Sequence, residues 1–455
     1  MEKVTQFFKL KERGTTFRTE ILAGITTFLA MAYILPVNSD MLGSTGMPVA
    51  GVFFATVMAS MIATMIMGFI ANYPVALAPG MGINAFFTYT VVLTYGLSWE
   101  AALAAVFVSG VLFLILSISG IRQMVINAIP QGLKFAVGAG IGFFITFIGL
   151  QNAGIVVSDP ATFVALGDLS HPAVLLAIFG LLLVVILFVR GNRFALIISI
   201  VITAIVGLLL GAIGVDHMPA LADTQEGLFA GARETFFAAF RGFGELFRTP
   251  QAAFIIFTFL FVDFFDTAGT LIAVGNRAGL IDDNGDLVDG NKALLADSVG
   301  TVAGSLLGTS TVTSYIESST GIEQGGRTGL TAITTGLLFL ISLLAYPLIS
   351  IVTGIYDPVT DIVYSPVTAM ALILVGAIMV TQLKHIDFDD KPLLIASFLT
   401  IVFMIFSFSI AEGIAVGFIF YPIAMLATKR HKDVSPIMYV LMFVFILYFV
   451  LLAIV

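Results

Sequence analysis

The chain has no cysteine and few charged residues, and each shortage excludes a class of protein. Without cysteine it forms no disulfide, uses no catalytic thiol and holds no thiolate-bound metal. Only 11% of its 455 residues are charged, whereas a soluble globular domain averages about a quarter. The net charge of −8 offers no basic surface, so we expect no nucleic-acid partner.

Apolar residues dominate instead, at 59% of the chain and a mean hydropathy of +1.08. Apolar runs near 20 residues recur along it, each long enough to cross a bilayer core of about 30 Å. Only helices and closed barrels satisfy their backbone in lipid, and barrel strands would alternate apolar and polar residues. Runs such as Ala173–Val189 do not alternate. The sequence therefore predicts an all-α polytopic membrane protein.

We expect about fourteen spanning segments in two sets of seven. The first set occupies residues 21–213 and the second residues 251–428. Residues 214–250 form an extracytoplasmic loop in which Thr235–Phe247 has the pattern of an amphipathic surface helix. Residues 429–455 form a basic cytoplasmic turn and one further apolar segment. The expected segments are Ile21–Leu42, Val49–Ile70, Val75–Thr94, Ala101–Ser119, Pro130–Gln151, Pro172–Val189, Phe194–Gly211, Ala252–Val274, Ala293–Leu307, Thr309–Gly321, Thr328–Thr353, Ser365–Val380, Leu393–Phe408 and Glu412–Ala427.

The placement of lysine and arginine orients these segments. Residues 1–20 are polar and basic, with no apolar core, so we expect a cytoplasmic N-terminus and no signal peptide. The connections Asn152–Ser170 and Gly354–Tyr364 contain aspartate but neither lysine nor arginine. Basic residues concentrate in cytoplasmic loops, so these two connections should face outward. We place the chain in the cell membrane.

The two sets of segments also resemble each other in sequence. Short matches recur at the nearly constant offsets of 231, 233 and 236 residues. The matched pairs are Thr27–Leu29 with Thr258–Leu260, Ile83–Asn84 with Ile316–Glu317, and Pro130 with Pro366. Because each repeat has an odd number of spanning segments, the second repeat would begin on the opposite side of the membrane from the first and would therefore be inverted. Inverted repeats are typical of secondary transporters, which bind substrate near the midplane between the repeats.

Segments three and ten are interrupted at corresponding places in the two repeats. Ala78–Asn84 contains proline and glycine, and Thr309–Gly321 is rich in hydroxyl and β-branched residues. We predict a broken helix in segment three, and in segment ten a short extended piece followed by a half-helix. The free backbone groups at such breaks can bind a polar ligand. The alternative for segment ten is a surface loop. Matched interruptions indicate the binding site of a transporter.

Four acidic residues fall within predicted spans, namely Asp263, Asp266, Asp297 and Glu317, and no lysine or arginine lies deep in a predicted span. A charge near the bilayer centre is costly, so such residues usually face a cavity and carry function. All four are candidates for proton coupling. The alternative for each, strongest for Asp263 and Asp297, is a structural hydrogen bond. None of the four histidines lies deep in a span, so we expect no histidine cluster and no metal site.

Aromatic residues flank the acidic and polar positions. Phe264 and Phe265 precede Asp266, and Phe86 follows Asn84 closely. A flat heteroaromatic ligand can stack on such a ring, although most of the 42 phenylalanines should contact lipid or other side chains.

At these positions the chain resembles the nucleobase–ascorbate permeases, and among them the AzgA-like adenine/guanine/hypoxanthine permease branch. The marks of the resemblance are Gly24–Ile34, Ala78–Phe87, Asp263–Thr270 and Glu317–Arg327. The resemblance covers nearly the whole chain. It implies a core domain from segments 1–4 and 8–11, a gate domain from segments 5–7 and 12–14, and short strands crossing in segments three and ten.

The resemblance also implies residue roles. Asp266 with Gly269 matches the family pattern of an acidic residue, two spacers and glycine, so Asp266 rather than Asp263 would bind substrate. Glu317 matches the residue that contacts the base, but Ser318 replaces the usual asparagine, which is what we expect of the purine branch. The expected substrate-binding residues are Asp266, Glu317, Phe86, Asn84, Ser318 and Thr320.

The sequence thus predicts a proton-coupled importer of purine bases that is not an enzyme and needs no cofactor. Its partners would be a purine base, a proton and the lipid bilayer, and a homodimer is one option that the sequence leaves open. The alternatives are a sulfate or bicarbonate transporter of the same architecture, which would want a cationic site, and a uracil or xanthine permease. A membrane-embedded enzyme would require a histidine cluster or metal ligands, which the sequence does not indicate. A channel would not require an inverted repeat.

Overall fold

The computed structural model describes residues 2–119, 129–220, 227–281, 287–360 and 362–454. Within these residues nine helices are long and apolar enough to cross a membrane, and four shorter apolar helices accompany them. The shorter four are Met81–Thr94, Ala369–His385, Lys391–Phe406 and Pro436–Val450. Expected segments three, twelve and thirteen are among the shorter helices, whereas segments nine and ten are in neither group. The class of fold is confirmed, but the count of fourteen spans is not.

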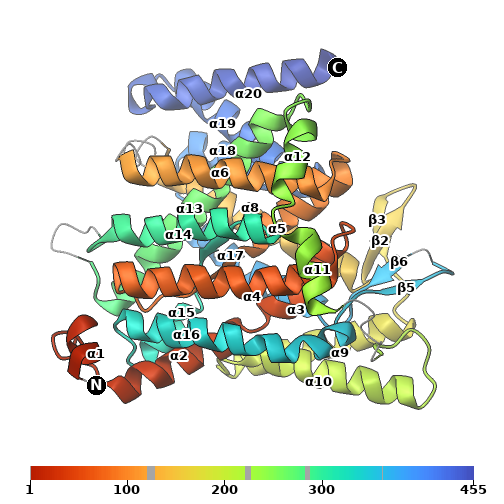
Figure 1. The fold of residues 1–455 in the computed structure, drawn as a ribbon. Coiled ribbons are helices and arrows are strands. Elements are labelled where there is room, and N and C mark those ends of the chain that lie inside the picture. Colours follow the sequence, from red (N-terminus) through yellow and green to blue (C-terminus); the bar gives the residue numbers. More distant parts are fainter. Residues whose placement is uncertain (1, 120–128, 221–226, 282–286, 361, 455) are drawn as a thin grey trace.

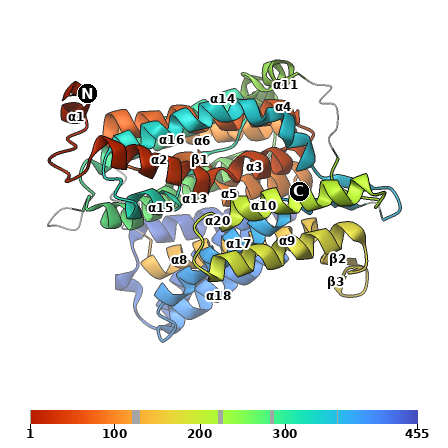
Figure 2. The same cartoon turned by 90° about the horizontal axis from the view of Figure 1, so that it is seen from below.

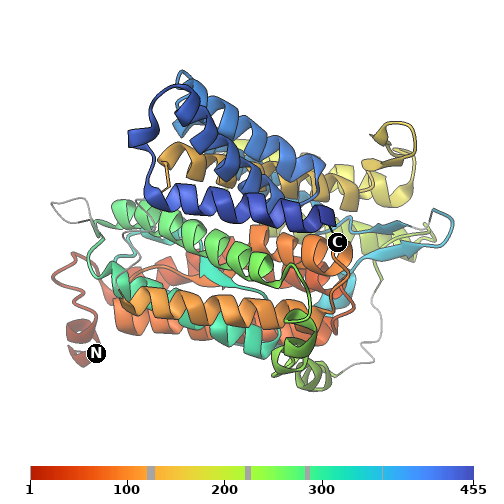
Figure 3. The ribbon, with the colours of Figure 1, turned by 90° about the horizontal axis from the view of Figure 1, so that it is seen from above.

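The helices form two bundles that lie side by side (Figures 2 and 3). In the first bundle α2 packs on α15 and α16, α4 packs on α14 and α16, and α6 packs on α13 and α14. The first bundle consists of α2 (Phe17–Met31), α3 (Ile34–Gly43), α4 (Val49–Ile66), η1 (Met67–Ala71), β1 (Leu77–Pro79), α5 (Met81–Ala85), η2 (Phe86–Thr94), α6 (Trp99–Ser119), α13 (Ala252–Ala278), α14 (Gly290–Leu307), β4 (Val312–Ser314), α15 (Ser318–Glu323), α16 (Gly329–Ile341) and η3 (Ser342–Ile351).

In the second bundle α8 packs on α17, α18 and α19, and α9 packs on α10 and α17. Small residues allow the close approach that helix packing in a membrane requires. A Cβ added at Gly142 of α8 would lie 2.8 Å from the carbonyl oxygen of Gly376 in α17. The second bundle consists of α8 (Gln131–Asn152), α9 (Pro172–Val189), α10 (Ala195–Ala212), α17 (Ala369–Val380), η4 (Thr381–His385), α18 (Lys391–Phe406) and α19 (Ile410–Ala427).

The first span is broken between α2 and α3. Pro36 lies in the first turn of α3 and has no N–H to donate, and its ring would clash with the carbonyl group of Ala32, four residues earlier. The break leaves Tyr33 at the junction, where its side chain points toward segment ten.

Segments three and ten cross as short antiparallel strands, as predicted. Strand β1 pairs with β4, and Ala78 lies opposite Thr313. Pro79 ends β1, and α5 begins two residues later at Met81. On the other side β4 leads into the short helix α15, which begins at Ser318. The pairing satisfies extended backbone that would otherwise lie unpaired within the protein.

Two β-hairpins project from the end of the molecule opposite the N-terminus (Figure 1). We call this end the hairpin end. The hairpins are β2 (Val156–Asp159) with β3 (Phe163–Leu166), and β5 (Ile355–Asp357) with β6 (Ile362–Tyr364). Both fall in the connections that the sequence places outside the cell.

The loop between the repeats forms two short helices, α11 (Leu228–Thr235) and α12 (Ala239–Leu246), rather than one amphipathic helix over Thr235–Phe247. The helix is interrupted because Phe237 takes a left-handed φ of 56°. Helix α11 packs on α4 and α12 packs on α6. The remaining elements are α1 (Glu2–Phe7), η5 (His431–Asp433) and α20 (Pro436–Ile454), which packs on α19.

Candidate functional site

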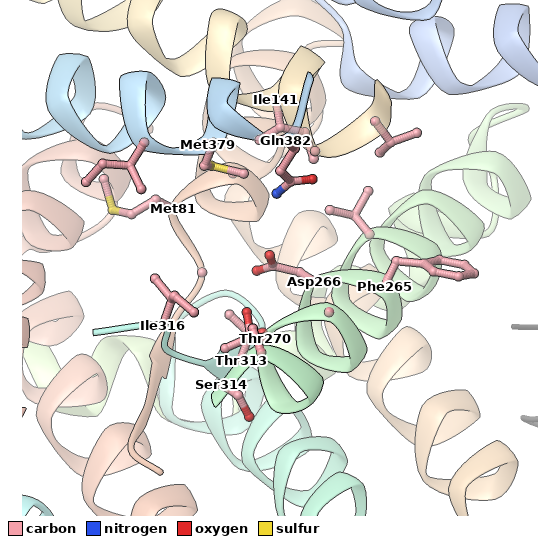
Figure 4. A pocket seen from close by; sticks show the side chains of 18 of the residues that line it. Met81, Ile141, Phe265, Asp266, Thr270, Thr313, Ser314, Ile316, Met379 and Gln382 are labelled. Carbon is pink, nitrogen blue, oxygen red and sulfur yellow. The ribbon is translucent and has the colours of Figure 1, made fainter. Parts of the chain in front are cut away.

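A cavity of about 600 Å³ lies between the two bundles and is lined by the break in each repeat. This volume falls within the usual range for small-molecule sites. The first bundle contributes residues of α5, α13 and β4, and the second contributes residues of α8, α17 and η4 (Figure 4). The lining is largely apolar, and its aromatic members are Tyr33, Phe135, Phe265 and Tyr315.

Two of the four predicted carboxylates, Asp266 and Glu317, line this cavity. Asp266 lies in the middle of α13, and its carboxylate points into the open space beside Phe265 (Figure 4). Glu317 lies where β4 gives way to α15, and its Oε1 accepts a hydrogen bond of 2.7 Å from the Tyr33 hydroxyl. Within the described residues, neither carboxylate forms an ion pair with lysine or arginine. Both therefore offer acceptor oxygens to a ligand.

The other two carboxylates, Asp263 and Asp297, are fully enclosed behind the cavity wall. Thr301 donates a 2.9 Å hydrogen bond to Asp263 Oδ2, and Thr267 donates a 2.8 Å hydrogen bond to Asp297 Oδ1. In each aspartate the other carboxyl oxygen is buried without a hydrogen-bond partner among the described residues. Neither group reaches the cavity, so neither can contact a ligand in it.

The Asp297 network extends to the cavity through hydroxyl groups. The Thr267 hydroxyl lies 2.7 Å from that of Thr313, a residue that lines the cavity. Ser314, also on the lining, donates a longer bond of 3.3 Å to Asp297 Oδ1. A chain of exchangeable protons thus joins a buried carboxyl group to the space between the bundles.

The remaining predicted site residues do not line the cavity. Phe86 is buried with its ring edge-on to Phe259, at a centroid distance of 4.9 Å. Asn84 donates a 2.6 Å hydrogen bond to Asn38 and accepts one from Ser310, so its amide holds the strand crossing together.

Hydrogen bonds within the first bundle also occupy the two hydroxyl residues predicted in segment ten. The Ser318 hydroxyl accepts a 3.0 Å bond from the Ala76 N–H, and the Thr320 hydroxyl donates to the Glu317 carbonyl oxygen at 2.7 Å. Both residues therefore shape the turn that carries Glu317 and lie outside the cavity lining.

The sequence prediction missed the polar side chains that the second bundle contributes. Lys134, Gln382 and His385 line the cavity from α8 and η4. Lys134 lies over the ring of Phe265, 5.3 Å from its centroid. The sequence analysis considered only lysine and arginine deep within a span, so it did not consider Lys134 as a lining residue. Lys134 is the fourth residue of α8, at the edge of the span, where the sequence alone does not distinguish it from the basic residues of a cytoplasmic loop.

The bundles touch closely at the hairpin end. Asp40 of α3 accepts hydrogen bonds from the Gly354 N–H at 2.9 Å and the Thr368 hydroxyl at 2.8 Å, both in the segment that leads into α17. Asn152 at the end of α8 donates a 3.1 Å bond to the Tyr89 hydroxyl in η2. These bonds seal the seam between the bundles on this side.

At the other end the two bundles are joined by a more exposed contact. Glu323, at the end of α15, pairs with Arg193 of the second bundle at 3.1 Å and with Arg277 of the first at 3.4 Å. The three side chains are between 39% and 57% exposed, so the pairs are screened and individually weak.

The structure also assembles a histidine cluster that the sequence was not expected to form. His171 and His217 lie beside Asp357, all at the hairpin end, although 46 and 140 residues separate them in sequence. No local spacing signals such a group, because each residue comes from a different connection between helices.

Two interrupted segments that cross beside a cavity between two bundles define a secondary transporter. Solved structures share this fold. The transmembrane domain of a cyanobacterium bicarbonate transporter, BicA, aligns with a TM-score of 0.60 at 16% identity, covering 88% of this chain and 96% of that one. The murine anion transporter Slc26a9 aligns at 0.62 and 11% identity, covering 90% of this chain and 68% of that one. The fold consists of two inverted repeats with short strands in the interrupted segments.

Sequence comparison narrows the class to one family. The family model described as "Permease family" matches residues 18–416, and the chain belongs to this family, in its AzgA-like purine permease branch. It is a permease and not an enzyme. The chain is 47% identical to the guanine/hypoxanthine permease PbuG of Bacillus subtilis, over 98% of this chain and 99% of PbuG. It is 41% identical to the adenine permease AdeP of Escherichia coli, over 97% and 94% of the two chains.

Proposed function

We propose that this permease imports adenine, guanine or hypoxanthine across the cell membrane by proton symport. The observation that carries the proposal is the convergence of Asp266 and Glu317 on one cavity between the bundles. The names of the relatives support a purine nucleobase as the substrate, since PbuG is a guanine/hypoxanthine permease and AdeP an adenine permease.

The lining suits the chemistry of a purine. A purine base is flat and apolar on its faces, and it carries N–H donors along its edge. Asp266 and Glu317 would accept hydrogen bonds from that edge. A ring of the lining would stack on the face, and the position of Phe265 makes it a better candidate than Phe86.

Transport would follow from the movement of one bundle against the other. We assign the first bundle as the core domain, which carries both carboxylates, and the second as the gate domain. With the N-terminus in the cytoplasm, the hairpin end faces outward and the Asp40 contacts close that side. The cavity includes Gln131 and His385, near the ends of α8 and η4 that lead toward the predicted cytoplasmic face, so this conformation would be the inward-facing one.

Proton coupling would use a carboxyl group that contacts the substrate. Asp266 and Glu317 can each bind a proton, and both lie in the space that alternates between the two sides. Asp297 reaches that space only through the Thr267 and Thr313 hydroxyls, so it would act as a reservoir at most. Asp263 would be structural.

The alternatives receive less support. An anion transporter of this architecture would require a cationic site, whereas the described lining of this cavity contains one lysine and two carboxylates. A uracil or xanthine permease would place a different residue at position 318, and the relatives named above are purine permeases.

The test is uptake of radiolabelled bases in cells that lack their own purine permeases. We expect this chain to confer adenine, guanine or hypoxanthine uptake that collapses when the proton gradient is removed. A tenfold excess of unlabelled purine should compete, whereas uracil and sulfate should not. Accumulation of uracil or sulfate without any purine would contradict the proposal.

A further inference from the structure

The histidine cluster at the hairpin end has the composition of a metal site. One ligand atom from each of His171, His217 and Asp357 lies within 4.8 Å of the other two. His171 Nε2 lies 3.5 Å from Asp357 Oδ2, and His217 Nε2 lies 3.9 Å from Asp357 Oδ1. We propose that these three residues form an extracytoplasmic binding site for a divalent transition-metal ion of the Zn²⁺ class.

The distances between the ligand atoms fit a shared ion better than direct hydrogen bonds. Hydrogen bonds from nitrogen to oxygen are about 2.7–3.2 Å long, and both separations exceed that range. Bonds of about 2.0–2.2 Å to tetrahedral Zn²⁺ place neighbouring ligand atoms about 3.3–3.6 Å apart. The observed 3.5 Å falls in this range, and a small rotation of the His217 side chain, which is 28% exposed, would shorten 3.9 Å.

An unpartnered nitrogen inside the protein is a second, independent sign. His171 Nε2 is buried and has no hydrogen-bond partner among the residues that the structure describes. The His171 side chain is only 12% exposed, and its ring stacks on Tyr364 at 4.5 Å between centroids. A buried polar atom without a partner is costly, and a coordinated ion would remove that cost.

Two hydrogen bonds within the β5–β6 hairpin orient the Asp357 carboxylate. Asp357 Oδ1 accepts a 2.9 Å bond from the Val359 N–H, and Oδ2 accepts a 2.8 Å bond from the Thr360 hydroxyl. Outer hydrogen bonds of this kind commonly fix metal ligands in place. A free lone pair on each oxygen faces the histidines.

The tautomer of His171 imposes one condition. Its Nδ1 accepts a 3.3 Å hydrogen bond from the Ala173 N–H, whereas metal binding through Nε2 requires the proton to move to Nδ1. The contact is long and therefore weak, so giving it up costs little beside a metal bond. His217 is held in a left-handed conformation, φ 57°, which is unusual for a residue other than glycine and directs its ring toward His171 at 5.1 Å.

The ligand set indicates the kind of ion. Two imidazoles and one carboxylate, with a fourth position open to water, resemble three-ligand zinc sites and suit Zn²⁺, Cu²⁺ or Ni²⁺. Calcium and magnesium prefer all-oxygen sites. A bound ion would tie the start of α9 and the end of β5 to the turn after α10.

The test is Zn²⁺ binding to the purified, full-length permease in detergent, prepared with a tag that contains no histidine and stripped with a chelator. We expect one Zn²⁺ per chain by titration against a chromogenic chelator. Co²⁺ in its place should give the visible absorption of a four-coordinate site. Each of His171→Gln, His217→Gln and Asp357→Asn should weaken binding at least about tenfold.

The matched control is His431→Gln, which removes an exposed histidine at the opposite end of the chain's membrane domain and should leave Zn²⁺ binding unchanged. Size-exclusion profiles show whether each variant is folded, and the wild-type titration is decisive without any variant. Absence of stoichiometric binding to the wild type overturns the proposal, and so does binding that survives His217→Gln or is lost in His431→Gln.

Discussion

The Tyr33 hydroxyl donates a 2.7 Å hydrogen bond to the Glu317 carboxylate, joining the break in the first span to the break in the tenth. Both residues line the cavity between the bundles. The bond fixes one oxygen of the carboxylate and leaves the other to a ligand. Tyr33 therefore sets how Glu317 is presented, although it lies 284 residues away in sequence.

Tyr33→Phe should weaken purine binding and shift the pH dependence of uptake. The substitution removes a hydrogen bond to a charged group, which contributes about 1.5–3 kcal/mol in folded proteins. Part of that loss should appear as weaker affinity, because Glu317 becomes free to turn. Equilibrium binding and uptake across a pH series measure both effects. Tyr315→Phe, whose hydroxyl donates to the Pro79 carbonyl and not to a carboxylate, is the control and should keep the wild-type pH profile.

Orientation in the membrane is testable because the native chain contains no cysteine. Val359→Cys places a thiol in the β5–β6 hairpin, where the native side chain is 88% exposed, and Lys429→Cys places one in the turn after α19. We expect an impermeant maleimide to label the first from outside the cell and the second only after the membrane is opened. Labelling of both from the same side would contradict the topology and the predicted cytoplasmic N-terminus.

The sequence was sufficient for those features that depend on local chemistry. Proline and glycine at 79–82 predicted the break in segment three, and the hydroxyl-rich run at 309–314 predicted the extended piece of segment ten, while the family resemblance implied that the two cross as strands. The position of Asp266 in an apolar span predicted that it lines the binding site, because a charged residue in a span usually faces a polar cavity.

The residues that were missed depend on packing between distant segments. Lys134 lies at the edge of a span, so its approach to Phe265 follows only from the way the two bundles dock. Phe86 was predicted to face the ligand because it follows Asn84, but η2 directs its ring toward Phe259 instead. The side of a helix on which one phenylalanine among 42 lies cannot be read from its neighbours in sequence.

The seam at the hairpin end should control access from outside. Asp40→Ala removes the acceptor for both the Gly354 N–H and the Thr368 hydroxyl, which would destabilise the closed contact between the bundles. We expect a cysteine placed at Ile316, on the cavity lining, to react faster with an external impermeant thiol reagent in this background. The control is Thr381→Ala. Thr381 caps the C-terminal end of α17, whereas Thr368 caps its N-terminal end, and the Thr381 hydroxyl donates to the Ile378 carbonyl oxygen within its own turn. Equal labelling rates would show that Asp40 does not hold the gate.

Gly82 lies where α5 packs against α8 of the second bundle. A Cβ added there would lie 2.5 Å from Cγ2 of Ile141 in α8, closer than real contacts allow. Gly82→Ala should therefore push the bundles apart or hold them in another conformation, and uptake should fall sharply. The double variant Gly82→Ala, Ile141→Ala removes the clashing methyl group and should recover much of the uptake. Failure of the second substitution to restore any activity would place the defect within α5 and not between the bundles.

The four acidic residues should separate into two functional pairs. Asp266→Asn keeps the shape of the side chain but removes its charge, and loss of a charge-assisted bond to the base would cost about 1.5–3 kcal/mol, or roughly 10- to 150-fold in affinity. Glu317→Gln keeps the Tyr33 contact but cannot exchange a proton, so we expect it to bind purine and to lose accumulation driven by a proton gradient.

The enclosed pair should behave differently from the exposed pair. Asp263→Asn retains an acceptor for the Thr301 hydroxyl and lies outside the cavity lining, so binding and coupling should both survive. Asp297→Asn retains an acceptor for the Thr267 hydroxyl but removes the titratable group at the end of the hydroxyl chain, so any loss should appear in the rate of uptake and not in affinity. Equilibrium binding beside gradient-driven uptake in proteoliposomes measures all four variants. If Asp266→Asn and Glu317→Gln both behaved as wild type while Asp263→Asn lost binding, the site would lie one helical turn from the cavity, behind its wall.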